Sequence, residues 1–358
     1  MRKSIFIAYC TIFIFFFLGC ASIANAVGES AKFSLAHIFP IEHFMNRELI
    51  KPWTKEVKKA SGGSVIINKF PVNKLVKSAE MYEGVVRGKA DIGVGAFGFR
   101  RNRFPVMEGF ELPGVYYGSA TATNLVARDG YKKFKPKELS DTKLMFLYSV
   151  GPGFLYSNKK VSSLEDLEGM RIRALGLTAK SIEALGAVPV SMPMPGVYEA
   201  LSKGGIEGMI GPPEVLKGWK MAKVTKYITI LPPVYNSLHF MVMNLKTWNT
   251  LPGDIQMAIE AINESYYIKA GQIWDRQMKK KGIDYGIKRH GMKMGRLSED
   301  DSTKAMVLLQ PIQDDYVDRM NIKGLPGQEI LDFAIEKAAV YSKQYNLYAN
   351  ITSVQVPK

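Results

Sequence analysis

Along the first hundred residues, apolar and polar positions change their period several times, and these changes predict alternating strands and helices. Residues 31–37 ("AKFSLAH") alternate before an apolar run, as in a strand, and "SVIINKFP" predicts a second strand. Between them, residues 42–60 predict a helix that ends at "SGG". A helix over 78–87 and a strand over 90–94 follow. This order is typical of βαβ units that build a parallel sheet.

The middle of the chain repeats this order. In "SSLEDLEG", Ser162 and Glu165 have the spacing of a capping box, which predicts a short helix ending at Gly169. "MRIRAL" alternates as a strand does, and a helix over 180–185 comes next. "AVPVSMP", "GVYEALSKGG" and "IEGMIG" predict a further strand, helix and strand. We therefore expect strand, helix, strand, helix, strand in each half.

Two stretches that are 116 positions apart share one pattern. "YEGVVRGKADIGVG" begins at position 82 and "YEALSKGGIEGMIG" at position 198. Gly88 and Gly204 stand where a helix ends, because glycine adopts a positive φ easily. Gly95 and Gly211 come just after the carboxyl end of a predicted strand, where open α/β sheets bind ligands. The alternative is a chance match between two ordinary βαβ units.

The remainder predicts one strand and three helices. "LHFMVMN" from position 238 predicts the strand, and "LSEDD" and "LPGQEI" begin the last two helices. The first helix is long and reaches about position 281, with apolar side chains near helical spacing. Its apolar positions are Ile255, Ile259, Ile262, Tyr266 and Ile273. The tail from position 350 is mostly polar and is expected to be loose.

The first 26 residues have the composition of a secretory signal peptide. Arg2 and Lys3 precede an apolar run over 5–18, and Ala24 and Ala26 offer a small-x-small cleavage site. That run is shorter than the roughly 20 residues of a membrane span. Lipoprotein processing at Cys20 is the alternative, and the cleaved soluble form is the favoured interpretation.

Composition narrows the class of protein further. The 358 residues predict about two domains, and both cysteines, Cys10 and Cys20, lie in the leader. The mature protein is therefore expected to have no disulfide and to depend on its core alone. The net charge of +15 comes from scattered residues, which favours a solvated surface over a bias toward anionic ligands, and export disfavours nucleic acid as a partner.

Motifs of catalysis are missing from the sequence. His37, His43, His239 and His290 do not have metal-ligand spacing. There is no Gly-x-Ser-x-Gly elbow, which disfavours a serine hydrolase, and no phosphate-binding glycine loop after a strand. The sequence thus predicts neither an enzyme nor a metal site.

The segment "LEDLEGMRIRALG" carries the most unusual charges. Arg171 and Arg173 share one face of a short predicted strand, and Arg173 is nearer the carboxyl end. A guanidinium there can hold a carboxylate through two parallel hydrogen bonds. The alternative is a surface ion pair with a glutamate, and these residues alone leave both interpretations open.

Five segments together resemble the substrate-binding proteins of TRAP-type (tripartite ATP-independent periplasmic) transporters. In chain order they are "WTKEVKKASGGSVIINKFP", "YEGVVRGKADIGVGAFGF", "FPVMEGFELPGVY", "SSLEDLEGMRIRALG" and "ALGAVPVSMPMPGVYEALSKGGIEGMIGPP". The resemblance covers nearly all of the chain after the leader, although no single motif is decisive.

The resemblance implies an α/β, two-lobed periplasmic-binding-protein fold. Each lobe holds a mainly parallel sheet flanked by helices, and a long helix spans both lobes. We expect a signal peptide over 1–26, lobe I over 27–151 with 238–277, and lobe II over 152–237 with 278–358. The family encloses a ligand, usually a carboxylate, by hinge closure, uses no cofactor and delivers the ligand to a membrane permease from the periplasm. The arginine that grips the carboxylate corresponds to Arg173.

Two departures from the family concern the expected pocket. Gly153 stands where many members have a basic residue, and Gly211, before Pro212, stands where many have asparagine. We therefore expect a larger, less polar pocket and a monocarboxylate ligand with an apolar or aromatic body. The residues expected at the site are Arg173, His37, Phe39, Ala96, Phe97, Gly98, Gly153, Phe154, Met209, Gly211, Pro212 and Asn236.

Two other functions remain open at this point. The same scaffold could present its ligand to a sensor protein instead of a permease, which the sequence does not distinguish. A secreted enzyme is the less favoured alternative, because it would need a nucleophile–base pair or a metal between the lobes.

Overall fold

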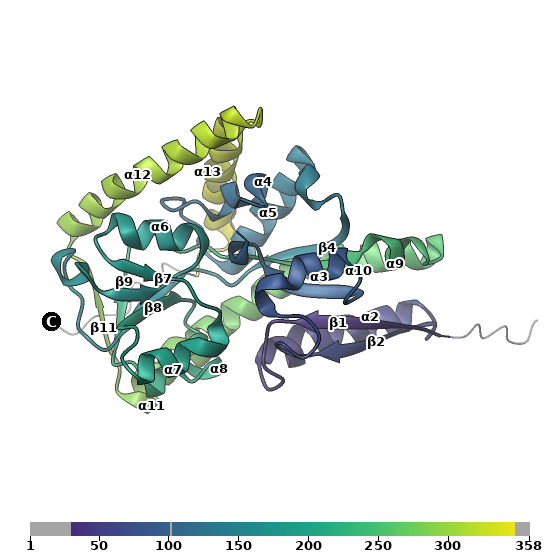
Figure 1. The fold of residues 1–358 in the computed structure, drawn as a ribbon, viewed down its shortest axis with the longest axis horizontal. Coiled ribbons are helices and arrows are strands. Elements are labelled where there is room, and N and C mark those ends of the chain that lie inside the picture. The colour runs from purple at the N-terminus through teal and green to yellow at the C-terminus, as the bar shows by residue number, and fades with distance from the viewer. Residues whose placement is uncertain (1–29, 101, 348–358) are drawn as a thin grey trace, which may run out of the picture.

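The computed structural model describes residues 30–100 and 102–347, without the side chains of 279–281 (Figure 1). The predicted signal peptide, the alternative lipidation site at Cys20 and the polar tail from position 350 lie outside the described residues.

A five-stranded sheet forms the first half of the fold. Its strands lie in the order β2-β1-β3-β10-β4. The strands β1, β2 and β3 are parallel, whereas β10 runs antiparallel to both of its neighbours. Their bounds are β1 Ala31–His37, β2 Val65–Phe70, β3 Ile92–Ala96, β4 Thr142–Ser149 and β10 Leu238–Asn244.

A six-stranded sheet forms the second half, in the order β11-β9-β5-β8-β6-β7. Its parallel strands β7, β6 and β8 reproduce the arrangement of β2, β1 and β3, and β5 runs antiparallel to β8 and β9. The bounds are β5 Phe154–Ser157, β6 Arg171–Arg173, β7 Val188–Val190, β8 Gly208–Gly211, β9 Tyr227–Ile230 and β11 Lys293–Arg296. The fold is thus α/β with two mixed sheets.

Helices flank both sheets (Figure 1). Those beside the first sheet are α2 Lys51–Ala60, α3 Met81–Val86, α4 Pro105–Glu108, α5 Ala120–Phe134, α9 Leu245–Asn249 and α10 Gly253–Gln277. Those beside the second are α6 Gly176–Ala184, α7 Val197–Ser202, α8 Val215–Gly218 and α11 Asp284–His290, and the chain continues with α12 Glu299–Ile322 and α13 Gly327–Gln344. Two π-helical segments, Asn46–Ile50 and Met278–Ile283, precede α2 and α11.

The repeated sequence pattern corresponds to equivalent steps of the two sheets. The helices α3 and α7 lead into β3 and β8, and the predicted turn glycines Gly88 and Gly204 have φ values of 73° and 71°. Gly95 lies within β3 instead of after it, where a Cβ atom would come within 2.6 Å of the Phe240 ring. Gly211 is the last residue of β8.

The predicted capping box is displaced by one residue. Ser163 Oγ accepts a hydrogen bond from the Asp166 backbone N–H (3.4 Å), and Asp166 Oδ2 accepts one from the Ser163 N–H (3.1 Å). Asp166 also accepts from the Ser162 N–H at 2.7 Å. Only the 3₁₀ turn Glu165–Leu167 forms there. The shorter aspartate side chain reaches the backbone that glutamate was expected to cap.

A continuous helical segment connects the two halves. Beside the first sheet, Asn263 Oδ1 of α10 accepts a hydrogen bond from Trp53 Nε1–H of α2 (2.9 Å). The segment continues through Met278–Ile283 into α11, where Gly282 lies so near Pro213 that a Cβ atom would come within 2.5 Å of it. The helix expected to reach both lobes is therefore present as α10 with its π-helical extension.

The last two helices bind to both halves. Lys180 of α6 pairs with Asp315 of α12 at 2.8 Å, and Arg319 of α12 pairs with Glu108 of α4 at 2.9 Å. The next helix, α13, lies against α5, where Tyr341 donates to Asp129 at 2.6 Å. The sequence-based boundaries put α13 with the second lobe, whereas its packing puts it beside the first sheet.

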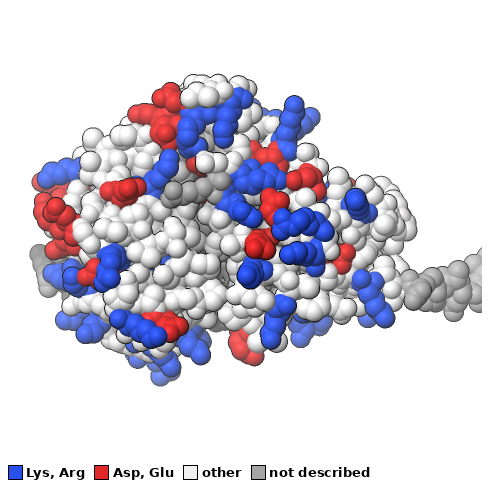
Figure 2. Space-filling view, viewed as in Figure 1, with Lys and Arg blue, Asp and Glu red and all other residues white. Residues whose placement is uncertain are grey.

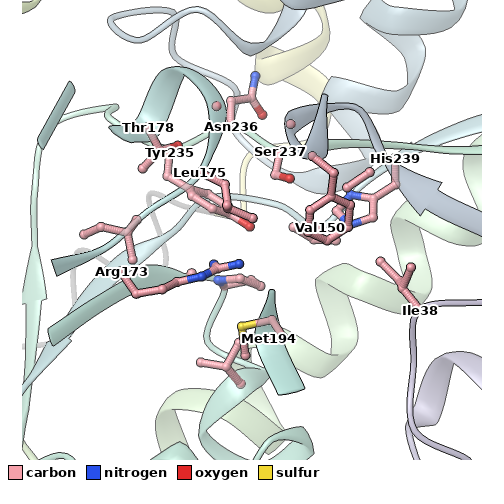
Figure 3. Close-up of a pocket in the computed structure, with 18 of the residues that line it drawn as sticks. Ile38, Val150, Arg173, Leu175, Thr178, Met194, Tyr235, Asn236, Ser237 and His239 are labelled. Carbon is pink, nitrogen blue, oxygen red and sulfur yellow. The ribbon is translucent and has the colours of Figure 1, made fainter. Parts of the chain in front are cut away.

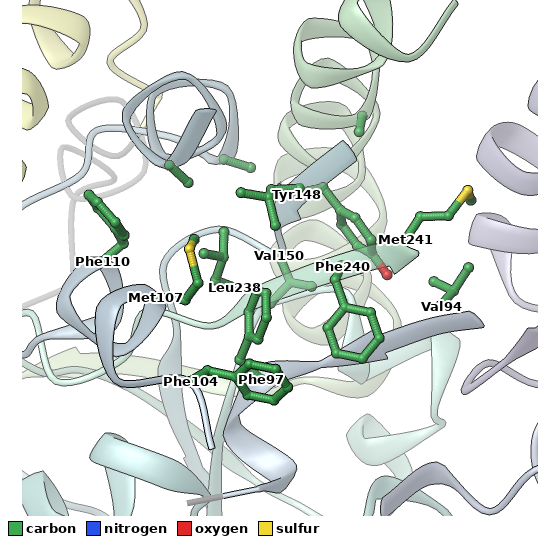
Figure 4. Packing of buried hydrophobic residues seen from close by; sticks show 14 of the residues in the cluster. Val94, Phe97, Phe104, Met107, Phe110, Tyr148, Val150, Leu238, Phe240 and Met241 are labelled. Atoms are coloured by element: carbon green, nitrogen blue, oxygen red, sulfur yellow. The ribbon is translucent and has the colours of Figure 1, made fainter. Parts of the chain in front are cut away.

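Buried aromatic rings form much of the core beside the first sheet (Figure 4). The Phe97 ring centre lies 4.8 Å from that of Phe104 and 5.1 Å from that of Phe240. Phe97 follows β3 directly, so this packing fixes the backbone at the sheet edge that faces the second half.

Candidate ligand-binding site

A cavity lies between the two sheets, at the carboxyl ends of β1, β3, β6 and β8 (Figure 3). Two chain crossings, near Val150 and over 234–237, also contribute to its wall. It offers about 80 Å³ to the centres of water-sized molecules. This is several times the roughly 10–15 Å³ that a cavity needs to hold one water. The size suits a small organic ligand.

Arg173 is a buried cation that has no counter-ion in the described part of the chain. It ends β6 and is 6% exposed, and its Nε donates to the Met192 carbonyl at 3.0 Å. Among the described residues, no carboxylate forms an ion pair with it. Burial lowers the pKa of Arg173 to about 10, so the guanidinium stays protonated at neutral pH. A buried unpaired charge is costly, and an anionic ligand would relieve that cost.

Arg171 has the other role considered for this strand. Its side chain is 48% exposed, with Nε 3.8 Å from Glu207 Oε2 and Nη2 donating to the Gly204 carbonyl at 2.8 Å. The two arginines therefore lie in different environments: Arg171 makes the surface ion pair, and Arg173 lines the cavity.

Tyr235 occupies the space that Gly153 was expected to open. A Cβ atom on Gly153 would come within 2.5 Å of the Tyr235 ring, so glycine is needed for the ring to lie there. In Figure 3 the Tyr235 hydroxyl points toward the Arg173 guanidinium. Burial raises the pKa of Tyr235, and the charge of Arg173 opposes part of that shift. The expectation of a larger pocket at Gly153 is wrong, because an aromatic side chain fills it.

Two glutamates line the cavity without pairing with Arg173. Glu111 accepts a hydrogen bond from the Leu238 N–H at 2.6 Å, and burial raises the pKa of its carboxyl to about 8. Glu214 lies after β8, and its Oε2 is 3.0 Å from His43 Nε2. The His43–Glu214 pair thus joins the segment after β1 to the segment after β8, across the two halves.

The end of the cavity away from Arg173 is mostly apolar. Ile38, Val150 and His239 lie there in Figure 3. His239 is 7% exposed, and its ring centre lies 5.1 Å from that of Tyr148. Burial lowers the pKa of His239 to about 4, so its imidazole is neutral at neutral pH.

A glycine contact and a basic rim border the opening. A Cβ atom on Gly98, in the 3₁₀ turn Phe97–Phe99, would lie 3.9 Å from the Gly176 Cα of α6. A smaller cavity beside this contact is lined by charges of both signs, Arg100 and Lys180 together with Glu108 and Glu111. Figure 2 shows lysine and arginine side chains, mixed with fewer acidic ones, over the region of α3 and α4. These charges favour the approach of anions.

The structure brings seven of the twelve predicted site residues to the cavity. They are Arg173, Phe39, Ala96, Gly98, Gly211, Pro212 and Asn236. The other five do not line it: His37, Phe97, Gly153, Phe154 and Met209.

The five residues are excluded for identifiable reasons. Phe97 packs among core rings, and Gly153 lies under Tyr235. Phe154 and Met209 are fully buried in a hydrophobic cluster of the second half. His37 is 1% exposed at the end of β1, where its ring centre lies 6.4 Å from that of Phe39.

Sequence reasoning did not find Tyr235 and His239. Tyr235 follows two prolines in "PPVYN", a composition that marks a chain crossing but not a pocket. His239 stands in "LHFMVMN", and a polar residue within an apolar strand was the available signal.

In the ranges 30–100 and 102–347, no three His, Cys, Asp or Glu side chains group as metal ligands would. None of the helices described there is long and apolar enough to cross a membrane.

Comparisons with known proteins agree with this architecture. The family model described as bacterial extracellular solute-binding protein, family 7, matches residues 35–319. One similar structure is a TRAP solute-binding protein from a marine metagenome, which is specific for aromatic acid ligands and was solved with metahydroxyphenylacetate. Its TM-score is 0.82 and its sequence identity 27%, over 87% of this chain and 99% of that one. One from Rhodoferax ferrireducens, solved with copurified benzoate, has a TM-score of 0.80 and 25% identity over 88% and 99% of the two chains. The outer membrane transporter protein TsaT of Comamonas testosteroni is 24% identical over 82% of this chain and 88% of its own.

Proposed function

This chain belongs to the bacterial extracellular solute-binding proteins of family 7, and we propose that it captures an aromatic monocarboxylate at Arg173. It is a TRAP-type solute-binding protein, a class of periplasmic receptors that capture organic carboxylates and work with membrane permeases. The family is a receptor family and not an enzyme family. The ligand's aromatic nature, the residues that hold it and the delivery to a particular permease are the proposed parts.

The buried, unpaired Arg173 carries the proposal. A ligand carboxylate would accept hydrogen bonds from the terminal guanidinium nitrogens, because Nε is already bonded to Met192. Charge-assisted hydrogen bonds of this kind contribute about 1.5–3 kcal/mol each. The Tyr235 hydroxyl, on the same side, would donate to the same carboxylate.

The rest of the cavity supports a ligand with one charge and an apolar body. Arg173 is the single lysine or arginine among the described residues that line it. A second carboxylate would therefore be buried without a cation, which is unfavourable. The walls include Phe39, Val150, Leu175 and Trp219, which suit an aromatic ring. The ligands of the two structural relatives, metahydroxyphenylacetate and benzoate, support the same class.

Binding would close two lobes around the ligand. We propose that the two sheets are the lobe cores and that the chain crossings and α10 act as the hinge. Closure brings Gly98 against Gly176 and His43 against Glu214, and the closed surface would be presented to the permease. Loss of uptake on gene deletion would favour transport over the alternative role beside a sensor.

The test compares the two arginines of β6. In calorimetry with benzoate, Arg173→Ala should weaken binding at least about thirtyfold, because truncating one side of a buried charge pair costs about 2–5 kcal/mol. Arg171→Ala, the matched control, should bind as the wild type does. Without ligand, Arg173→Ala should be at least as stable as the wild type, since it removes a buried unpaired charge. Unchanged benzoate affinity in Arg173→Ala would contradict the assignment.

A further inference from the structure

The cavity has a second polar group at the end opposite Arg173. In Figure 3, Arg173 and the Tyr235 hydroxyl lie on one side, and His239 lies on the other beside Val150. His239 belongs to β10, directly across from Ala96 of β3 and Tyr148 of β4. Its position is therefore fixed by two strand pairings and not by a loop.

His239 keeps unused hydrogen-bonding capacity in this buried place. The imidazole has one hydrogen-bonding contact, with the Ser237 backbone. Its Nδ1 is fully enclosed without a well-formed hydrogen bond among the described residues, so Nε2 is the ring nitrogen that can face the cavity. A buried polar atom without a partner is uncommon in native proteins, and an unmade hydrogen bond there costs about 1–3 kcal/mol. Two other polar side chains of the wall are engaged elsewhere: Asn236 donates to the Phe110 carbonyl at 2.7 Å, and Glu214 contacts His43.

We propose that His239 binds a hydroxyl group of the ligand, so that the preferred ligands are hydroxy-substituted aromatic monocarboxylates. This inference rests on the proposed function above, in which Arg173 holds the carboxylate. The ligand would extend from Arg173 along the apolar walls and place its hydroxyl at the far end.

The chemistry of a buried imidazole supports a hydroxyl over a second carboxylate. A neutral imidazole offers one donor and one acceptor nitrogen, and a hydroxyl group can serve as either partner. Burial opposes the protonated form of His239, so the ring does not supply the positive charge that a carboxylate would need. No lysine or arginine lines that end of the described cavity.

The experiment varies both the ligand and residue 239. Calorimetry would measure benzoate, 3- and 4-hydroxybenzoate and the corresponding benzenedicarboxylates against the wild type, His239→Leu and His239→Gln. For the wild type we expect one hydroxybenzoate to bind about three- to tenfold more tightly than benzoate, as one hydrogen bond allows, and the dicarboxylates to bind more weakly. His239→Leu should lose this preference, so that benzoate and the hydroxybenzoates bind it with similar affinity. His239→Gln, which retains a donor and an acceptor, should keep part of it.

The outcomes separate this inference from the function on which it rests. Equal affinity of the wild type for benzoate and both hydroxybenzoates, or the same preference in His239→Leu, would overturn the role of His239. In either case benzoate binding that depends on Arg173 would still support the proposed function. Failure of the wild type to bind any of these acids would instead overturn the proposed function. If His239→Leu does not fold, as its thermal unfolding would reveal, the wild-type ligand series and His239→Gln decide.

Discussion

Single residues set the chemistry of the cavity through what they exclude. Arg173 has no counter-ion among the described residues, and Gly153 has no side chain where the Tyr235 ring lies. The absence of a side chain at 153 is thus a condition for the placement of Tyr235. The space beside Gly153 is filled by the phenol of another segment, 82 positions further along.

Adding one carbon at Gly153 tests that arrangement. Gly153→Ala would bring Cβ to 2.5 Å from the Tyr235 ring, so the ring must move and its hydroxyl leaves Arg173. We expect benzoate affinity to fall about tenfold or more, and stability to fall by about 1–3 kcal/mol from overpacking. Gly295→Ala is the control, since nothing lies within 4 Å of a Cβ there. Calorimetry and urea unfolding measure the two effects, and an unaffected Gly153→Ala would show that Tyr235 is placed by something else.

Glu111 predicts a pH dependence of stability. Burial raises the pKa of its carboxyl to about 8, above the ordinary value of 4.5. Between those two values the unfolded chain loses the proton and the folded protein keeps it. The stability contribution of the protonated carboxyl is therefore complete below pH 4.5 and is lost as pH rises to about 8. Relative to Glu111→Gln, the wild type should lose stability over this range, as thermal melts at several pH values would measure. Parallel curves for the two proteins would contradict the burial argument.

At the scale of elements, whether a helix position requires glycine depends on what packs against it. Gly271 and Gly253 both belong to α10, but a Cβ atom on Gly271 would lie 2.4 Å from the Thr121 Cα of α5. Nothing lies within 4 Å of one on Gly253. The close approach of α5 and α10 thus depends on one glycine in the middle of the longer helix.

Alanine at these two positions should have opposite effects. Gly271→Ala must push the helices apart against a backbone atom, so we expect a loss of at least about 2 kcal/mol in the free energy of unfolding. Gly253→Ala should be neutral or slightly stabilising, because alanine is the better helix former. Chemical denaturation measures both, and equal stabilities would mean that the contact between α5 and α10 yields easily.

The sequence predicts elements well where the local pattern of residues is enough to determine the element. The strands β1, β2, β6 and β10 and the turns at Gly88 and Gly204 follow from short-range periodicity and glycine's backbone freedom. The strands β4 and β5 were not predicted, because they are buried almost throughout and therefore lack an alternating pattern. Arg173 was a candidate as an unusual charge at a strand end, but the residues alone left a surface ion pair equally open, and its assignment to the site came from the family resemblance. Tyr235 and His239 could not be predicted, because their roles depend on contacts between distant segments.

At the scale of the whole molecule, the two halves meet at small contacts, on which the proposed closure depends. Gly98 and Gly176 allow the backbones to meet at one side of the cavity, and the His43–Glu214 pair joins the halves at another. Gly176 has a φ of 55°, which glycine adopts without strain, so both the shape and the approach of this turn favour glycine.

A graded series at Gly98 tests closure. Gly98→Ala places Cβ at 3.9 Å from the Gly176 Cα, an ordinary contact, so its benzoate affinity should change little. Gly98→Leu extends further and should hold the halves apart, weakening binding about tenfold or more without lowering the stability of the ligand-free protein. Small-angle scattering would show the ligand-induced compaction in the alanine variant and not in the leucine variant. Normal compaction in Gly98→Leu would exclude this contact as part of closure.

The ion pairs along α12 have a consequence for the environment in which the protein works. Lys180, Asp315, Arg319 and Glu108 run from α6 through α12 to α4, so separation of the halves must break a link at one end of the series. The side chains of Lys180 and Asp315 are 36% and 46% exposed, and dissolved ions screen such a pair, whereas Arg173 is out of their reach. Rising ionic strength should therefore weaken the Lys180–Asp315 pair between the halves without weakening the contact of a ligand with Arg173. Higher salt would then speed ligand release by favouring separation of the halves.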